Sequence, residues 1–162
     1  MLRLTCGVLL VLLIAIPSLA QQPTPPLIPY GMSISTENAK KIAAAAIAEA
    51  QKIKCTEAIA IVDTGGYLLY FERMPDTQTG SIELAIEKAR TSVLFRRPTK
   101  ALEDMVAQGG LGLRVLRFTN AIPVEGGFPI IYDGKLIGAI GLSGGSGEQD
   151  GQVAKAAVSI IK

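Results

Sequence analysis

The chain has no histidine and no tryptophan, and only two of its 162 residues are cysteines. The absence of histidine excludes Ser-His-Asp and Cys-His catalysis and every zinc site that needs an imidazole ligand. An excess of charge of one sign is also missing, because 16 basic and 14 acidic residues leave a net charge of +2. A nucleic-acid-binding domain would carry a strongly basic, clustered surface, so this balance argues against a nucleic-acid partner.

The first 20 residues have the three parts of a cleavable secretion signal. Arg3 supplies a positive charge, residues 8–16 form an almost unbroken apolar run, and small residues follow at 18–20. The apolar run is too short for a permanent membrane span, which needs about 20 residues. We predict cleavage after Ala20 and a secreted or periplasmic protein with no membrane span after cleavage. A retained signal anchor is the alternative.

The remaining chain is predicted to hold a proline-rich leader over residues 21–32 and one domain over residues 33–162. Cys6 would leave with the signal, so Cys55 would be the one thiol of the exported protein, which excludes an internal disulfide. Cys55 lies between an expected helix and an expected strand. This position favours a buried structural cysteine over a reactive one.

The pattern of apolar residues predicts two β-hairpins among four helices. Apolar residues at three- and four-residue intervals predict the helices, and short apolar runs around turn residues predict the hairpins. Asp133-Gly134 is suited to a tight hairpin turn because both residues accept a positive φ. The expected elements are a helix capped by Ser35 and ending near Lys54, strands 58–62 and 67–71, a helix from Ser81 to about Phe95, a helix beginning at Thr99 and stopping at Gly109, strands 128–132 and 135–142, and a last helix with Val153, Ala157 and Ile160 on one face.

These elements follow the order α-β-β-α-α-β-β-α. We make no clear prediction for residues 111–120, which lie between the third helix and the second hairpin. Two hairpins without long crossovers indicate a central antiparallel sheet with helices packed on it. The fold class is therefore predicted to be α+β, in one domain.

Glycine-rich backbone near the C-terminus is the first candidate for a ligand site. The loop at residues 143–147, Ser-Gly-Gly-Ser-Gly, opens a helix and could offer free amides to a carboxylate or phosphate. The alternative is a tight connection with no ligand, and the loop matches no nucleotide-binding motif. Gly138 and Gly141 lie inside a strand, where glycine indicates a close neighbour: a helix, another subunit or a planar ligand.

Charged residues supply the other candidates. Arg90, Arg96 and Arg97 surround the end of the second helix, where they could clamp the carboxylates of an anionic ligand or simply favour the helix C-terminus. Glu148 and Asp150, with Glu125, could bind a metal or act as acid and base. Stabilisation of the last helix's N-terminus is the more ordinary role for Glu148 and Asp150.

Several of these segments together resemble the GlcG/HbpS-like family, also called haem-degrading or haem-binding domains. The resemblance extends from Ser33 to the C-terminus, and the combined motifs are far more specific than any single glycine pair. The matching segments are Asp63 with Gly65-Gly66, residues 71–74, residues 85–92 with Phe95 and Thr99, residues 126–130, Asp133-Gly134, residues 137–145, and Gln149-Asp150 with Val153-Ala154.

The resemblance implies an α+β domain that assembles into homo-oligomers, with haem or another small anionic ligand as partner. Because the chain has no histidine, the possible contacts to haem iron are Cys55, a tyrosine, a methionine, a lysine or a hydroxyl such as that of Thr99. Binding of haem at a surface without strong ligation is the alternative. No metal site is expected. The predicted ligand-binding residues are Arg90, Arg96, Thr99, Gly126, Gly127, Pro129, Ser143, Gly144, Gly145 and Asp150.

Three functions stay open on the sequence. The preferred one is an exported protein that binds haem or a related tetrapyrrole, in haem or redox sensing or in protection. The second is an enzyme that degrades haem or acts on a small oxidised metabolite in a glycolate, propanediol or corrinoid context. The third is a ligand-free oligomeric accessory protein for a membrane sensor. No nucleophile paired with a base is identifiable, so we lean against an enzyme.

Overall fold

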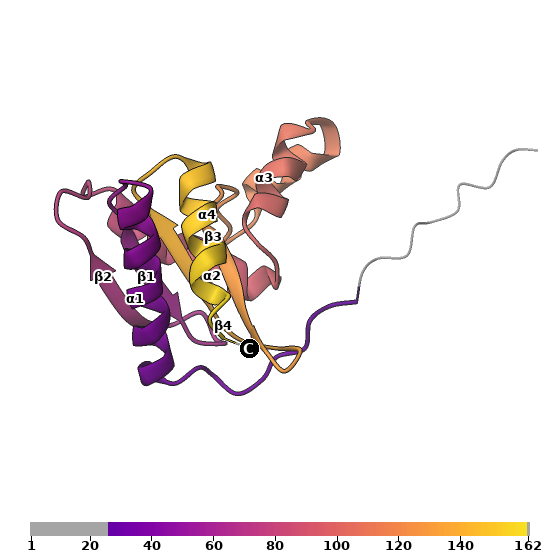
Figure 1. Cartoon of the computed structure of the whole chain (residues 1–162). Coiled ribbons are helices and arrows are strands. Elements are labelled where there is room, and N and C mark those ends of the chain that lie inside the picture. The colour runs from indigo at the N-terminus through magenta and orange to yellow at the C-terminus, as the bar shows by residue number, and fades with distance from the viewer. Residues whose placement is uncertain (1–25, 162) are drawn as a thin grey trace, which may run out of the picture.

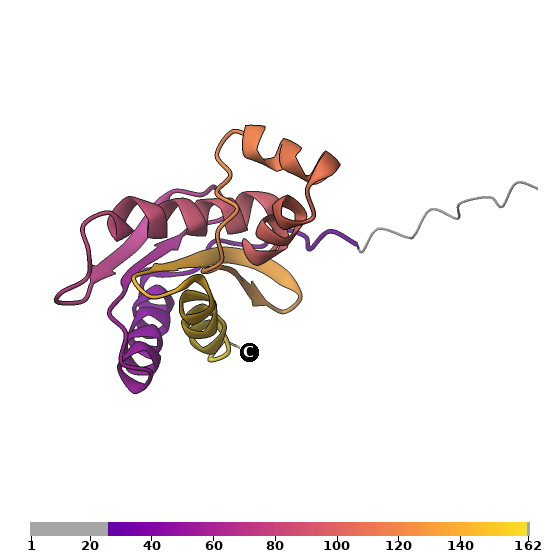
Figure 2. The same cartoon turned by 90° about the horizontal axis from the view of Figure 1, so that it is seen from above.

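The computed structural model describes residues 26–161, and a four-stranded antiparallel sheet lies at its centre (Figure 1). The strand order is β2-β1-β4-β3, so the two hairpins meet through β1 and β4. Helices α1 and α4 cover one face, and α2 covers the other (Figure 2). The predicted α+β class is confirmed. The elements are α1 Thr36–Lys52, β1 Ala58–Val62, β2 Leu68–Arg73, α2 Ser81–Phe95, α3 Lys100–Ala107, the 3-10 helix η1 Gly110–Arg117, β3 Gly127–Tyr132, β4 Lys135–Ser143 and α4 Gly147–Val158.

Isoleucine and leucine side chains of the sheet meet mainly alanines of the helices between the sheet and the α1–α4 layer. The Ser35 hydroxyl caps α1 by accepting a hydrogen bond from the Asn38 amide at 3.2 Å, as the sequence predicts. Four alanines and Ile42 of the α1 stripe are buried in one cluster with Ile59, Ile61 and Ile140 of the sheet. This layer is an ordinary hydrophobic core, whose stability comes from apolar area removed from water.

Small side chains line the opposite face of the sheet, where α2 packs. Alanines and valines of β1, β4 and α2 make up most of this layer. A methyl group added at Gly141 would lie 2.0 Å from the Ala85 carbonyl oxygen, so the α2 backbone itself occupies the space beside this strand. At Gly138 the added carbon would lie 2.5 Å from the Val62 carbonyl oxygen. Helix and strand backbone therefore explain the strand glycines, and no planar ligand is needed there.

The hairpin turn at Asp133-Gly134 has the predicted geometry. Asp133 has φ 47° and Gly134 has φ 68°, which are the left-handed values of a two-residue turn. The turn brings Tyr132 opposite Lys135, so these two side chains lie at the same end of the sheet.

The C-terminal part of the chain differs from the prediction in two places. Helix α4 ends at Val158, and Ile160 lies beyond it with 47% of its surface exposed, so its predicted place on the buried face is wrong. The helix stops because Ser159 turns its hydroxyl back to the Ala156 carbonyl. Residues 110–117 form a 3-10 helix that projects with α3 from the body (Figures 1 and 2). Its leucines are largely exposed, which is why no buried stripe could be recognised there.

The described end of the leader is attached to the sheet beside β4. Tyr30 forms a parallel bridge with Leu136, and the Gly31 amide donates to the Leu136 carbonyl at 2.8 Å. The Tyr30 hydroxyl also donates to the Val93 carbonyl at 3.0 Å. Within residues 26–161 no helix is long and apolar enough to cross a membrane. The predicted signal peptide and cleavage site lie outside the described residues.

Candidate functional site

A buried ion pair lies between the sheet, α2 and α4. The Lys88 ammonium is 2.6 Å from Oδ2 of Asp150 and donates a second hydrogen bond to the Leu142 carbonyl at 3.0 Å. The two side chains are only 1% and 3% exposed. A charge removed from water is costly unless an opposite charge and hydrogen bonds replace the lost hydration, and this pair provides both.

A second carboxyl group lies close to this pair. Glu57 is fully buried, and its Oε2 has no hydrogen-bond partner among the described residues, while Oε1 accepts from the Cys55 thiol at 3.4 Å. Burial, with the nearby Asp150 charge, raises the pKa of Glu57 to about 8. Burial also raises the pKa of Asp150, against the opposing effect of Lys88. Glu57 therefore holds its proton at neutral pH. The buried cluster thus consists of one protonated carboxyl group and the Lys88–Asp150 ion pair.

The Cys55 thiol is an unreactive member of this group. Burial and then the Glu57 carboxyl raise the pKa of Cys55 to about 12, so the thiolate is scarce at neutral pH. Cys55 is half-buried rather than fully buried, and it packs against the apolar core. The structural role expected for this cysteine agrees with these surroundings.

Glycine backbone closes the buried pair on the β3 side. A side chain at Gly126 would lie 2.8 Å from the Lys88 Nζ, and one at Gly127 would lie 2.4 Å from the Lys88 carbonyl oxygen. The Gly127 amide donates to the Thr99 hydroxyl at 2.9 Å. Thr99 lies at the start of α3 but makes no side-chain cap there, because its hydroxyl accepts the hydrogen bond from the Gly127 amide of β3 instead. The predicted start of this helix at Thr99 agrees with the structure, where Thr99 is the N-cap residue of α3.

The glycine-rich loop before α4 binds its own chain. The Gly145 amide donates to Oδ1 of Asp150 at 2.9 Å, and the Ser146 amide donates to Oε1 of Gln149 at 2.9 Å. Ser146 and Gln149 form the capping box of α4. Glu148 and Asp150 both lie in the first turn of α4, as predicted, and Asp150 also points inward to Lys88. Among the described residues, no group of acids or cysteines is arranged to hold a metal.

The predicted arginines contact their own chain at separate places. Arg90 pairs with Glu87 and donates to the Gly66 carbonyl at 3.3 Å. Arg96 donates to the Ile28 carbonyl at 3.2 Å and lies with its guanidinium 5.0 Å from the centre of the Tyr30 ring. These contacts fasten a turn and the leader to α2, so each guanidinium already has a structural role.

The structure thus brings together seven of the ten predicted residues around Lys88, or in the loop beside it, but as a packed interior. These are Thr99, Gly126, Gly127, Ser143, Gly144, Gly145 and Asp150. Pro129 is buried within β3. Sequence reasoning missed Lys88 and Glu57. The signal for Lys88 was its spacing, three residues after Ala85 and four before Ser92, which puts it on the buried face of α2.

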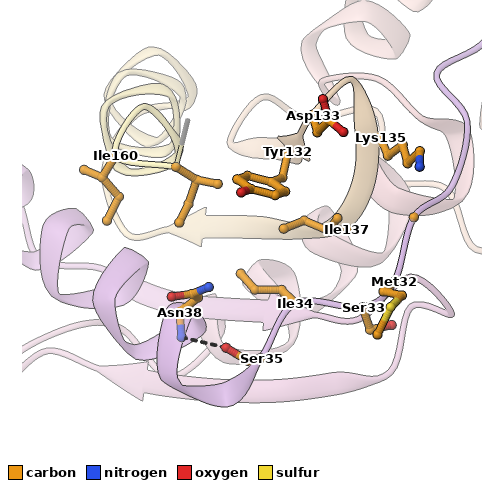
Figure 3. A pocket seen from close by; sticks show the side chains of 12 residues that line it. Met32, Ser33, Ile34, Ser35, Asn38, Tyr132, Asp133, Lys135, Ile137 and Ile160 are labelled. Carbon is orange, nitrogen blue, oxygen red and sulfur yellow. Dashed lines mark hydrogen bonds between the residues drawn. The ribbon is translucent and has the colours of Figure 1, made fainter.

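An open cleft of about 560 Å³ lies elsewhere, at the end of the sheet where the leader, the start of α1, the β3–β4 turn and the C-terminus meet (Figure 3). None of the ten predicted residues lines it. Its apolar surface comes mainly from four isoleucines, Ile34, Ile137, Ile160 and Ile161. Its polar groups include Tyr132 and Lys135 from the hairpin and Asn38 from α1. A concave, mostly apolar surface with a few polar groups is the usual form of a small-molecule site, at volumes of about 300–1,000 Å³.

Two polar groups at this cleft, the Tyr132 hydroxyl and the Lys135 ammonium, are free of partners within the chain segment described. Tyr132 is 53% exposed, and neither its hydroxyl nor the Lys135 ammonium makes a hydrogen bond or ion pair with residues 26–161. In Figure 3 the Tyr132 ring points across the cleft toward the side of Ile160, and Lys135 extends in the opposite direction, away from the Tyr132 ring. The cleft therefore offers a phenol, an ammonium and a thioether beside apolar walls.

Comparison with known proteins identifies the family. Residues 34–159 match the family model described as haem degrading protein HbpS-like. Protein GlcG of Escherichia coli K12 is 42% identical over 110 residues, which are 68% of this chain and 81% of GlcG.

Two crystal structures have the same fold. The PduOC:haem complex has a TM-score of 0.73 at 34% identity and covers 81% of this chain and 96% of PduOC. A double mutant of HbpS from Streptomyces reticuli has a TM-score of 0.75 at 27% identity and covers 88% of this chain and 99% of HbpS. The chain therefore belongs to the HbpS-like family, as its glycine and helix motifs predicted.

Proposed function

We propose that this protein binds haem or a related tetrapyrrole, and that the cleft of Figure 3 is the binding site. The observation that carries the proposal is the similarity to PduOC, a homologue at 34% identity whose crystal structure is a haem complex. The chain's own structure adds an exposed apolar cleft of suitable volume.

The residues of the cleft fit such a ligand. A tetrapyrrole needs apolar surface for its macrocycle, a cation for its carboxylates and, if it carries iron, an axial ligand. Ile34, Ile137 and Ile160 supply apolar surface, and Lys135 supplies an unpaired cation. Tyr132 and Met32 have side chains of the types that ligate haem iron in proteins. Iron in such a site would supply redox chemistry or ligand exchange.

The buried Lys88–Asp150 pair is a poorer place for a ligand. Both charges are compensated within the chain, and Gly126 and Gly127 are packed on them without space for even a methyl group. A ligand there would have to break the ion pair and separate α2 from the sheet. We therefore assign this group to stability and the cleft to binding.

Export and assembly are part of the same proposal. The apolar run near the N-terminus supports secretion into the periplasm or medium, and the family resemblance supports a homo-oligomer. A membrane sensor is the proposed partner if the protein reports haem or redox state. The sequence of the mature N-terminus, read from protein exported by cells that express the full chain, tests the cleavage after Ala20.

Titration of the purified protein with haemin tests the binding proposal. The expected result is a saturable Soret shift at micromolar haemin, with a defined number of haems per oligomer in parallel sedimentation. A linear absorbance increase identical to that of free haemin would refute the proposal. A stable oligomer without a shift would favour the ligand-free accessory role.

Haem degradation is a second candidate, because the matching family model is described as haem degrading. It predicts that the Soret band of bound haem disappears under peroxide or a reductant with turnover. Free haemin at the same concentration is the control. Loss at the same rate with and without the protein would exclude catalysis.

A further inference from the structure

We propose that Tyr132 is the axial ligand of the iron, so that the protein takes ferric haem through a phenolate in place of histidine. This inference rests on the proposed haem-binding function. It adds which atom would bind the iron, the phenol oxygen of Tyr132, and which oxidation state of the iron that atom favours.

Other possible ligands are engaged elsewhere in the described part of the chain. The Cys55 thiol donates to Glu57, and its pKa of about 12 makes the thiolate scarce. The Thr99 hydroxyl is fully buried and accepts from the Gly127 amide. The Lys88 ammonium is held by Asp150. Each would have to lose an interior contact before it could bind iron.

The other tyrosines do not line the cleft. The Tyr30 hydroxyl donates to the Val93 carbonyl, and the Tyr70 hydroxyl donates to Glu72 at 2.7 Å. Tyr67 is exposed at the start of β2, away from the cleft residues. Tyr132 therefore combines, among residues 26–161, a hydroxyl without a hydrogen-bond partner with a place in the cleft wall.

The position of Tyr132 is also rigid. It is the last residue of β3 and pairs with Lys135 across a tight turn that fixes both strands. Its ring lies across the cleft beside the isoleucine side chains, where a macrocycle would be placed (Figure 3). A side chain held at the end of a strand loses little conformational entropy when it binds iron.

The chemistry favours the ferric state. When the phenol oxygen bonds iron, the O–H bond breaks, the proton passes to water and an Fe–O bond forms without any change in oxidation state. The anionic oxygen neutralises one of the positive charges of the ferric porphyrin. Ferrous iron has one charge fewer and attracts a phenolate less, so reduction is expected to weaken binding.

Two conservative variants and a metal-free porphyrin test the inference. Tyr132→Phe keeps the ring and removes the oxygen, and Met32→Leu keeps the volume of the other possible ligand in the cleft. The full-length gene product and both variants are titrated with haemin and with protoporphyrin IX, and circular dichroism checks the fold. The haemin complexes are examined for phenolate-to-iron charge transfer by visible and resonance Raman spectroscopy.

We expect Tyr132→Phe to lose the charge-transfer band and to bind haemin about tenfold more weakly, because a metal–ligand bond is removed. Its affinity for protoporphyrin IX should equal that of the wild type, and Met32→Leu should keep the band. A Tyr132→Phe protein with unchanged haemin affinity and spectrum would overturn the inference while leaving haem binding intact. Failure of the wild type to bind haemin would overturn both.

Discussion

The molecule has two polar regions that differ in their access to water. Around Lys88 the charges are buried between the sheet and α2, and Gly126 and Gly127 pack on them without space for a side chain. In the cleft, Tyr132 and Lys135 are exposed and have no partner among residues 26–161. The comparison teaches that a cluster of functional-looking residues can serve the fold, while an unremarkable turn supplies the surface that can bind a ligand. The following variants test this division.

The largest effect is expected from Lys88→Met, which leaves Asp150 buried and unpaired. Breaking a buried ion pair on one side costs about 3–5 kcal/mol, so urea unfolding should show a loss of that size. Lys100→Met removes an exposed pair with Asp104 and should leave the free energy of unfolding almost unchanged, because surface ion pairs contribute little.

A double variant separates the charge from the packing. Lys88→Met combined with Asp150→Leu should recover most of the lost stability, because no uncompensated charge remains. A Lys88→Met protein as stable as the Lys100→Met control would contradict the burial of the Lys88–Asp150 pair from water.

Gly141→Ala tests how closely α2 lies against the sheet. The new methyl group would meet the Ala85 carbonyl and the Ala89 amide, and overpacking against backbone should cost about 2–3 kcal/mol. The control is Gly80→Ala, where nothing lies within 4 Å and φ is −62°. Equal midpoints in urea for the two variants would show that α2 can move away from the strand.

The pH dependence of stability tests the protonated state of Glu57. Between its ordinary pKa of 4.5 and its raised pKa of about 8, the folded protein holds a proton that the unfolded chain releases. The free energy of unfolding should therefore fall as pH rises through this window. Glu57→Gln should remove the slope and be roughly 1–3 kcal/mol more stable than the wild type at pH 8.5.

The exposed acid Glu83 provides the matched control. Glu83→Gln should unfold with the same dependence on pH as the wild type, because its carboxyl is exposed. A slope that persists in Glu57→Gln would mean that another group releases the proton.

The smallest effect on stability is expected in the cleft. Lys135→Ala should change the free energy of unfolding by less than about 0.5 kcal/mol, because the side chain is exposed and unpaired in the described region. Its haemin affinity should fall about fivefold, as expected for the loss of an exposed ion pair. Haemin dimethyl ester has no free carboxylates and should bind wild type and variant equally. A loss with the ester as well would mean that Lys135 acts through something other than charge.

Local patterns were enough to predict most of the fold. Ser35 as a cap, the alanine-rich stripe of α1 and the Asp133-Gly134 turn each depend on residues a few positions apart, so the sequence contains the full signal. The Lys88–Asp150 contact joins residues 62 positions apart, so the spacing that places Lys88 on the buried face of α2 does not reveal its partner. The cleft was missed for the same reason, since its walls come from both ends of the domain.

The arginines illustrate a different limit. Arg90 and Arg96 are close in sequence, which favoured a shared anion site, but their guanidinium groups have separate acceptors at Gly66 and Ile28. Those acceptors belong to a turn and to the leader, whose positions follow from tertiary packing. The spacing of the two arginines therefore predicted that both lie near the end of α2, but it did not predict which groups they bind.

Because the leader pairs with β4 next to the cleft, hydrogen exchange of the paired amides reports on the state of the cleft. The Gly31 amide donates to the Leu136 carbonyl and the Leu136 amide donates to the Pro29 carbonyl, each at 2.8 Å. Met32 and Ser33, which follow Gly31 directly, line the cleft. Detachment of the leader would expose these amides and remove one wall of the cleft in the same event. A ligand in the cleft stabilises the attached state by mass action, so it should slow deuterium uptake at Gly31 and Leu136 in proportion to its occupancy. Two backbone amides would then report cleft occupancy for ligands that have no colour of their own.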